Sequence, residues 1–183
     1  AGTENIRTNT NATFLQNINV GVAITAGKLG IGFTDGQVKI GNTALDSLTT
    51  GTKNTAVGDF ALTANTTGDS NVAVGYAVLD ANTTGTGNVA VGDRPLTSNT
   101  TGTGNVAIGQ YALNANTTAN YNTAVGRQSL TSNTTGTDNV AVGNNALNSN
   151  TTASDNTAVG DNALEANTTG NDNAALGSSA LVT

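Results

Sequence analysis

Small apolar and polar residues follow one another along the chain in a pattern that repeats every 17 residues. The motif Asn-x-Ala-aliphatic-Gly begins at Asn54 and returns at this spacing without an insertion, and a Leu stands eight residues after each motif Asn. A degenerate copy, QVKIG, begins at Gln37 with Leu45 in register. Each motif is a short alternating segment bounded by turn-forming residues, so it predicts a strand of about five residues.

One strand, a tight Ala-Leu turn and an Asn-Thr-Thr-Gly segment describe a single coil of a stacked structure. Stacking such coils pairs each strand in parallel with its copies above and below, about 4.8 Å away. The sequence therefore predicts an all-β fold, a parallel β-solenoid of about nine 17-residue coils over residues 37–183. Residues 1–36 are predicted to form an N-terminal arm and strand that acts as a cap or docking segment.

Two ladders of identical side chains are expected along this stack, because the nearest neighbours of each residue are its own copies one coil away. A buried amide without a partner costs about 1–3 kcal/mol, and stacked asparagines can hydrogen-bond amide to amide. Stacked leucines would form a continuous apolar spine. The predicted structural ladders consist of Asn54, Asn71, Asn88, Asn105, Asn122, Asn139, Asn156 and Asn173, and of Leu62, Leu79, Leu96, Leu113, Leu130, Leu147, Leu164 and Leu181.

A second Asn opens an Asn-Thr-Thr triplet in each repeat, as at Asn65, and Gly usually follows it, as at Gly68. We expect this Gly to adopt a left-handed backbone conformation, and expect Ala119 and Ala153, which replace it twice, to be slightly strained. The triplets also match the acceptor pattern for N-glycosylation, although turn formation within a ladder explains them without a glycan.

The aliphatic position of the motif predicts an exposed stripe. If Ala and Leu fill the interior, then Val57, Val74, Val91 and Ile108 point outward, and an exposed apolar stripe indicates an interface. The inverse arrangement, with Val inside, stays open at this stage.

The N-terminal segment suggests a second route to self-association. Its alternating residues Ile18, Val20, Val22 and Ile24 predict a strand. The chain stops inside a repeat near Leu181, so we expect this strand to dock on the C-terminal coil of the next subunit and form a filament.

Composition removes several classes of function. The chain has no Cys, His, Met or Trp, which excludes the usual zinc sites, haem ligation, disulfides and His-based catalysis. A net charge of −6 without a basic stripe argues against nucleic acid as a partner, and no apolar run is long enough to span a bilayer. The strict period leaves no place for a catalytic cleft, so we predict no enzyme activity, no cofactor and no metal site.

Variable positions after the repeat Gly carry the remaining candidate chemistry. Asp59, Asp93 and Asp161 are interpreted as solvated acids at a corner rather than as calcium ligands. Aromatic residues occupy the same corner in some copies, at Phe60, Tyr76 and Tyr111, and indicate either local packing or a binding epitope.

The tandem Asn-x-Ala-aliphatic-Gly motif, with Ala-Leu-x-x-Asn-Thr-Thr-Gly, resembles the head repeats of YadA-type trimeric autotransporter adhesins and of related phage and cell-surface fibres. The resemblance covers about residues 37–183 and implies a left-handed β-roll, commonly trimeric, displayed outside the cell or virion and used for adhesion. No heptad stalk or membrane-anchor barrel accompanies the repeats.

The predicted function is an extracellular structural or adhesive fibre that binds itself, as a trimer or an end-to-end filament, and has a possible surface or glycan ligand. The alternatives are an ice-binding or glycan-binding solenoid, and a head fragment of a trimeric adhesin or phage tail fibre. Adjacent Thr residues in each triplet weigh against ice binding, because a flat hydroxyl face needs alternate residues on a strand.

Overall fold

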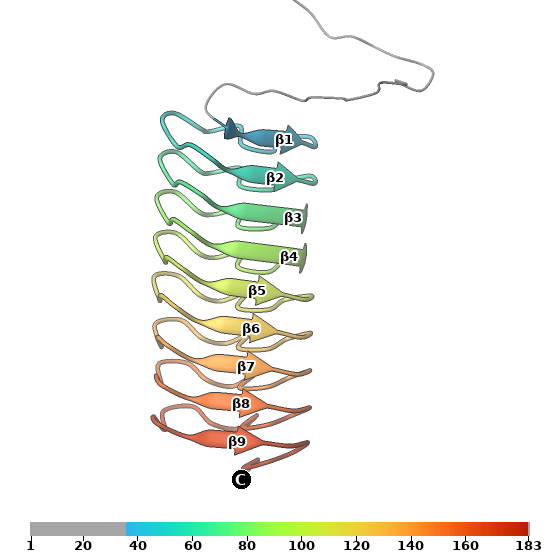
Figure 1. The fold of residues 1–183 in the computed structure, drawn as a ribbon, viewed down its shortest axis with the longest axis vertical. Coiled ribbons are helices and arrows are strands. Elements are labelled where there is room, and N and C mark those ends of the chain that lie inside the picture. The colour runs from blue at the N-terminus through green and yellow to red at the C-terminus, as the bar shows by residue number, and fades with distance from the viewer. Residues whose placement is uncertain (1–35, 183) are drawn as a thin grey trace, which may run out of the picture. The chain divides into compact units, whose positions relative to one another are not determined.

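The computed structural model describes residues 36–182, which form a stack of short parallel strands in one sheet (Figure 1). The strands are β1 (Val38–Ile40), β2 (Thr55–Val57), β3 (Val72–Tyr76), β4 (Val89–Asp93), β5 (Val106–Ile108), β6 (Thr123–Val125), β7 (Val140–Val142), β8 (Thr157–Val159) and β9 (Ala174–Leu176). Their order in the sheet is their order in the chain, and each residue pairs with its copy 17 residues on, as Ala56 does with Ala73. The predicted all-β parallel β-solenoid is confirmed.

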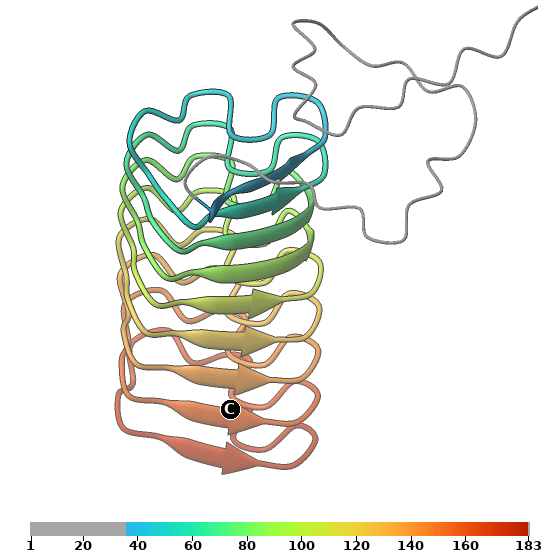
Figure 2. The same ribbon diagram turned by 45° about the horizontal axis from the view of Figure 1, so that its top comes forward.

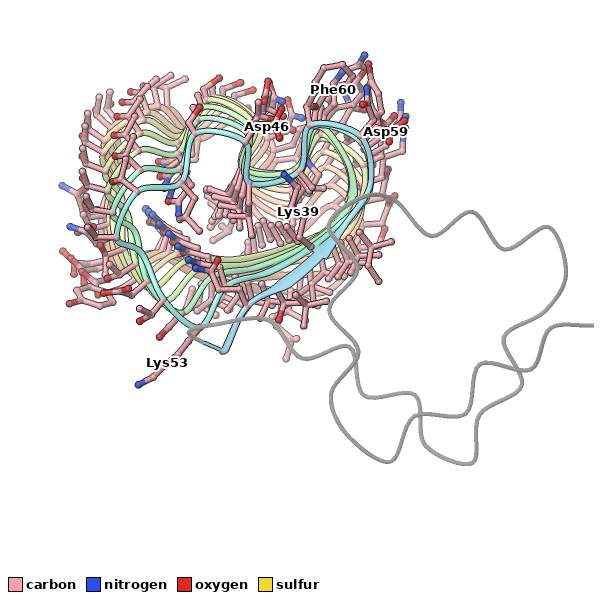
Figure 3. All side chains as sticks on the ribbon, turned by 90° about the horizontal axis from the view of Figure 1, so that it is seen from above. Lys39, Asp46, Lys53, Asp59 and Phe60 are labelled. Atoms are coloured by element: carbon pink, nitrogen blue, oxygen red, sulfur yellow. The ribbon has the colours of Figure 1, made fainter. Side chains whose placement is uncertain are left out.

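The coils wind in a left-handed sense. Seen from the β1 end, the chain runs anticlockwise (Figure 3) while it moves away toward β9 (Figures 1 and 2). Connections between parallel strands are nearly always right-handed when a helix packs back on the sheet. Here the return path from one strand to the next consists of turns and bends, so that packing constraint does not apply.

The interior contains the Ala and Leu residues of the motif. Ala56 and its copies are buried in the middle of each strand while the residues on either side are partly exposed. Leu62 and the leucines stacked on it are fully or nearly fully buried as far as Leu164, whereas Leu181 is 55% exposed. The valines of the motif therefore point outward, and the inverse arrangement is excluded.

Both columns of asparagines lie inside the stack and satisfy one another. The Asn71 side chain donates from Nδ2 to Asn54 Oδ1 (3.2 Å), which also accepts the Asn71 backbone N–H (3.0 Å). In the second column Asn82 Nδ2 donates to Asn65 Oδ1 at 2.8 Å. Asn54 and Asn65 have no exposed surface, so each amide oxygen depends on the copy in the next coil for its polar partner.

The two Asn columns meet at one backbone carbonyl in each coil. The carbonyl oxygen of Gly85 accepts from Asn71 Nδ2 at 2.9 Å and from Asn82 Nδ2 at 3.1 Å. The same pair of bonds recurs at the carbonyls of Gly68, Gly102, Ala119, Gly136 and Ala153. This carbonyl joins the start of the strand to the Asn-Thr-Thr turn across the interior of the coil.

The prediction of a left-handed conformation at Gly68 and its equivalents is wrong. These glycines are absent from the positive-φ residues, and so are Ala119 and Ala153. What disfavours a side chain here is the approach of neighbouring groups, since a Cβ on Gly85 would lie 2.4 Å from both Asn82 Oδ1 and the Gly102 carbonyl oxygen. The coils that contain Ala adjust slightly. Asn116 and Asn150 precede the two alanines, and their Oδ1 atoms lie 3.2 Å from Asn133 Nδ2 and 3.1 Å from Asn167 Nδ2.

Left-handed conformations occur elsewhere in the coil. The glycine that ends the motif has a φ of +129° at Gly109, and a Cβ there would lie 2.6 Å from the carbonyl oxygen of Gly126. The buried Leu of every coil also has a positive φ, which is 50° at Leu113. Such strain in a branched residue persists only where the surrounding packing fixes it.

Polar side chains also link the coils at the surface. Asp69 accepts hydrogen bonds from the backbone N–H and the hydroxyl of Thr52. These bonds lower the pKa of the Asp69 carboxyl group, and the bond from the backbone N–H has the largest effect. Asn120 occupies the same place three coils on, where its Oδ1 accepts the Thr103 backbone N–H at 2.7 Å.

The first coil differs from the others at its inward position. Lys39 pairs with Ala56 in the sheet, so it stands where the other strands have Ala, and its Nζ lies 2.8 Å from Asp46 Oδ1. Figure 3 shows Lys39 directed into the first coil, whereas Lys53 points away from it. An inward charge of this kind disfavours the stacking of another apolar coil on β1.

We predict that Gly109→Ala lowers the free energy of unfolding by about 3 kcal/mol or more, because the new methyl group meets the backbone of the next coil in a conformation unfavourable to Ala. Gly87→Ala is the matched control: its φ is +65°, but a Cβ there meets nothing within 4 Å, so the expected cost is only about 1 kcal/mol. Urea denaturation measures both. Equal costs would contradict the role of the inter-coil contact.

We also predict a pH dependence at Asp69. Its folded pKa is lowered, so its carboxylate adds stability above the ordinary pKa, and this contribution disappears as the pH falls through the folded value. Asp69→Asn keeps an acceptor for Thr52, as Asn120 does for Thr103. Between about pH 5 and pH 2 the urea midpoint of the wild type should fall further than that of the variant. Parallel curves would show that this bond does not affect stability.

Candidate self-association face

The outward side chains of the sheet form a continuous flat surface, here called the outer face. It has two columns, set by the first and third residues of each strand. The first column is Val38, Thr55, Val72, Val89, Val106, Thr123, Val140, Thr157 and Ala174, and the second is Ile40, Val57, Val74, Val91, Ile108, Val125, Val142, Val159 and Leu176. No charged residue occurs in either column, so the outer face is apolar apart from three Thr hydroxyls.

The outer face is exposed along its length. Its residues are partly or fully exposed, and the largest exposures belong to Ile40 (47%), Ile108 (40%) and Leu176 (82%). Nine strands about 4.8 Å apart and two columns about 7 Å apart give a surface of roughly 300 Å². The largest apolar patch on a single chain commonly has about this size and is often functional.

The outer face is also rigid, because neighbouring strands are hydrogen-bonded to each other and the buried Asn side chains bond to the backbone at the start of each strand. Flat β-surfaces of this kind pack face to face about 10 Å apart in proteins. The face offers shape and apolar area but no arrangement of acids, bases or nucleophiles. Within the described part of the chain, no group of three or more Asp or Glu residues lies close enough to hold a metal ion.

The predicted site residues fall into three groups. Val57, Val74, Val91 and Ile108 lie together in the second column of the outer face. The Asn and Leu ladder residues lie inside, except that Asn173 and Leu181 in the last coil are partly or largely exposed. Ile18, Val20, Val22 and Ile24 lie outside the described residues.

The stripe predicted from the sequence covers only one of the two columns of the outer face. The first column is apolar in most coils, as at Val72, Val89, Val106 and Val140, but the predicted stripe included only the second column. Alternation along the strand was the available signal, because it places the residues on either side of the buried Ala on the same surface.

The triplet threonines do not form a comparable flat surface. Thr66 donates its hydroxyl to the carbonyl oxygen of Thr83, one coil on, at 3.0 Å, and in every triplet but the last only the second Thr, such as Thr67, is exposed. One column of hydroxyls is thus engaged within the stack. The amides of Asn65 and Asn82 are buried and hydrogen-bonded, so these two triplets offer no accessible acceptor for a glycan in the folded coil, whereas Asn167 in the last triplet is partly exposed.

Comparison with known proteins adds no relative. No protein-family model matches the chain, and neither the curated proteins nor the solved structures contain a match. In residues 36–182 there is also no helix with the length and apolar character needed to cross a membrane. The similarity to adhesin head repeats therefore stays a prediction from the motif.

We predict that the two faces of a strand respond oppositely to a larger side chain. Ala107→Leu overfills the interior, where Ala107 has no exposed surface, and should lower the free energy of unfolding by about 1–3 kcal/mol. Val106→Leu, one residue earlier on the outer face, should change it by less than about 0.5 kcal/mol. Chemical denaturation of both variants in dilute solution tests this, and a similar cost for the two would contradict the assigned facing.

Proposed function

We propose that the protein is a structural fibre protein whose stacked coils associate side by side through the outer face. The observation that supports this most directly is an apolar, rigid surface that continues over all nine strands without a charge. We also propose an extracellular or surface location and an adhesive use. For these the support is the resemblance of the motif to adhesin and fibre repeats, together with a composition rich in Asn, Thr and Gly and without Cys or Met.

The size of the outer face bears on the mode of assembly. A stable pair of proteins usually buries about 800 Å² on each partner, and the outer face supplies roughly 300 Å². The contact must therefore extend onto the flanking turns, or each copy must meet more than one neighbour, as in a trimer or a bundle.

The inward ion pair of the first coil favours lateral contact over direct stacking of one coil on another at the β1 end. A coil placed on β1 would cover Lys39 and Asp46, whose side chains are now 42% and 50% exposed. Covering them removes hydration that the apolar edge of a second stack does not replace. An end-to-end contact through the N-terminal segment is a separate prediction and needs its own variant.

We predict that the wild-type protein forms assemblies larger than one chain, and that Val74→Lys/Val91→Lys/Ile108→Lys raises the concentration needed for assembly at least tenfold. Three ammonium groups on the outer face would have to be desolvated at the contact. Analytical ultracentrifugation gives the mass, and negative-stain microscopy shows whether fibres form.

Thr84→Lys/Thr101→Lys/Thr118→Lys is the matched control, because these residues are exposed on the Asn-Thr-Thr turn, away from the outer face. It should assemble like the wild type. Deletion of residues 1–25 separates the two modes: shortened fibres with intact lateral pairs would indicate end-to-end docking. A monomeric wild type, or equal assembly of both lysine variants, would refute the lateral proposal.

A further inference from the structure

One corner of the stack departs from the repeat in a chemically specific way. It follows the motif Gly in the second to fifth coils and holds three of the aromatic residues in the described part of the chain. We call it the corner patch and define it as Phe60, Tyr76, Asp93, Arg94, Gln110 and Tyr111. It adjoins the outer face but belongs to neither of its columns.

The aromatic and basic groups of the corner patch form one connected arrangement. The rings of Phe60 and Tyr76 meet edge to face with centroids 5.8 Å apart, and the guanidinium carbon of Arg94 lies 5.0 Å from the Tyr76 ring centroid. Arg94 Nη1 also donates to the hydroxyl oxygen of Tyr111 at 3.2 Å. Beside them Gln110 Nε2 donates to Asp93 Oδ2 at 3.0 Å.

The repeat itself shows that the fold does not need these residues. The sixth coil has Arg127 and Gln128 at the two corner positions, and the last three coils have Asn144 and Asn145, Asp161 and Asn162, and then Ser178 and Ser179. The backbone at the second corner position is left-handed in all of them, with φ of 60° at Phe60, 58° at Tyr111 and 54° at Asn145. Asn tolerates this left-handed conformation better than a bulky aromatic residue does.

The aromatic rings also stay exposed after their mutual contacts. Phe60 is 39% exposed and Tyr76 is 44% exposed, so each keeps apolar surface in water, and Phe60 does so at a left-handed backbone position. Residues that the fold could replace by Asn, yet which are held rigidly at the surface, are typical of a binding site rather than of a structural corner.

The chemistry of the corner patch fits a neutral saccharide. Aromatic rings offer apolar surface to the C–H groups of a pyranose, while the carboxylate, amide and guanidinium offer acceptors and paired donors to its hydroxyl groups. Asp93 and Arg94 lie close together, with 3.8 Å between Oδ1 and Nη1, so their charges largely offset each other and do not favour a strongly ionic ligand. Contacts that hold Arg94 in place reduce the entropy lost on binding.

The geometry points to a saccharide chain rather than a single sugar. The patch extends over four successive coils, so equivalent positions recur about every 4.8 Å along the stack. A linear polymer lying along the axis can contact one coil after another. We propose that the corner patch binds a short stretch of a neutral polysaccharide, and this inference does not depend on the association of copies through the outer face.

The test measures retention of the wild-type protein by insoluble cellulose and chitin, and retardation by soluble mannan and laminarin in affinity electrophoresis. We expect at least one of these probes to bind, and expect Phe60→Asn/Tyr76→Asn and Arg94→Gln each to weaken that binding about tenfold or more. Asn at the first two positions follows the later coils, so the melting temperature should change by no more than a few degrees.

Tyr121→Asn is the matched control, because Tyr121 is 63% exposed and occupies the position of Lys53 four coils on. Figure 3 shows Lys53 and Phe60 at opposite corners of the coil. The control should bind like the wild type, and sedimentation of the patch variants should show unchanged assembly. Binding of none of the four probes, equal binding by patch variants and control, or loss of assembly without a change in saccharide binding would overturn the proposal. The last result would assign the patch to a protein contact.

Discussion

The shared carbonyl at which two asparagine side chains meet is the interaction on which the other features of the stack depend. In the coil of β3 it is the Gly85 oxygen, which accepts from Asn71 and Asn82 while both amides also bond to their copies in the previous coil. Breaking one amide contact leaves buried polar atoms on two coils without partners, at a cost of about 1–3 kcal/mol for each atom. Because every coil has the same requirement, an insertion inside the array would separate both Asn columns at once. The strict 17-residue period follows from this requirement.

Sequence variation is consequently greatest at positions that point away from the interior, although the buried position of Ala61 also varies and holds Val78 and Ser129 in other coils. Ala and Leu fill most of a narrow core, and Gly109 approaches the next backbone too closely for a side chain. The outward positions carry no such restriction. There the first column varies among Val, Thr and Ala, and the corner has aromatic or basic residues in the second to sixth coils and Asn, Asp and Ser in the last three. Residue differences between coils at the outward positions therefore indicate where binding can occur. The repeated residues at the inward positions are explained by stability alone.

The sequence was sufficient for the fold because the period places each residue against its own copy, and it correctly indicated which residues alternate across each strand. It was insufficient where backbone conformation depends on contacts between coils. The glycine after Asn-Thr-Thr resembled a left-handed turn residue, but its role depends on its distance from Asn82 Oδ1 and the Gly102 carbonyl, which no local pattern reveals. The left-handed Leu113 was equally hidden, since a buried Leu normally favours other conformations. The contacts of Arg94 with Tyr76 and Tyr111 join residues 17 or 18 positions apart, so only the stacked structure brings them together.

Lateral association of such stacks poses a problem of register, because two faces with the same pitch of about 4.8 Å fit equally well at every whole-coil shift. Uniform columns of Val would leave the alignment of two copies undetermined, as flat strands with no distinguishing side chains do. The outer face is not uniform. Its three largest exposed side chains, Ile40, Ile108 and Leu176, stand in β1, β5 and β9, so each follows the previous one by four coils. When two outer faces pack together, these projecting residues fit best beside the smaller valines between them, and shifts that bring them into collision are disfavoured. A spacing of four coils thus reduces the number of allowed alignments without placing any charge on the face.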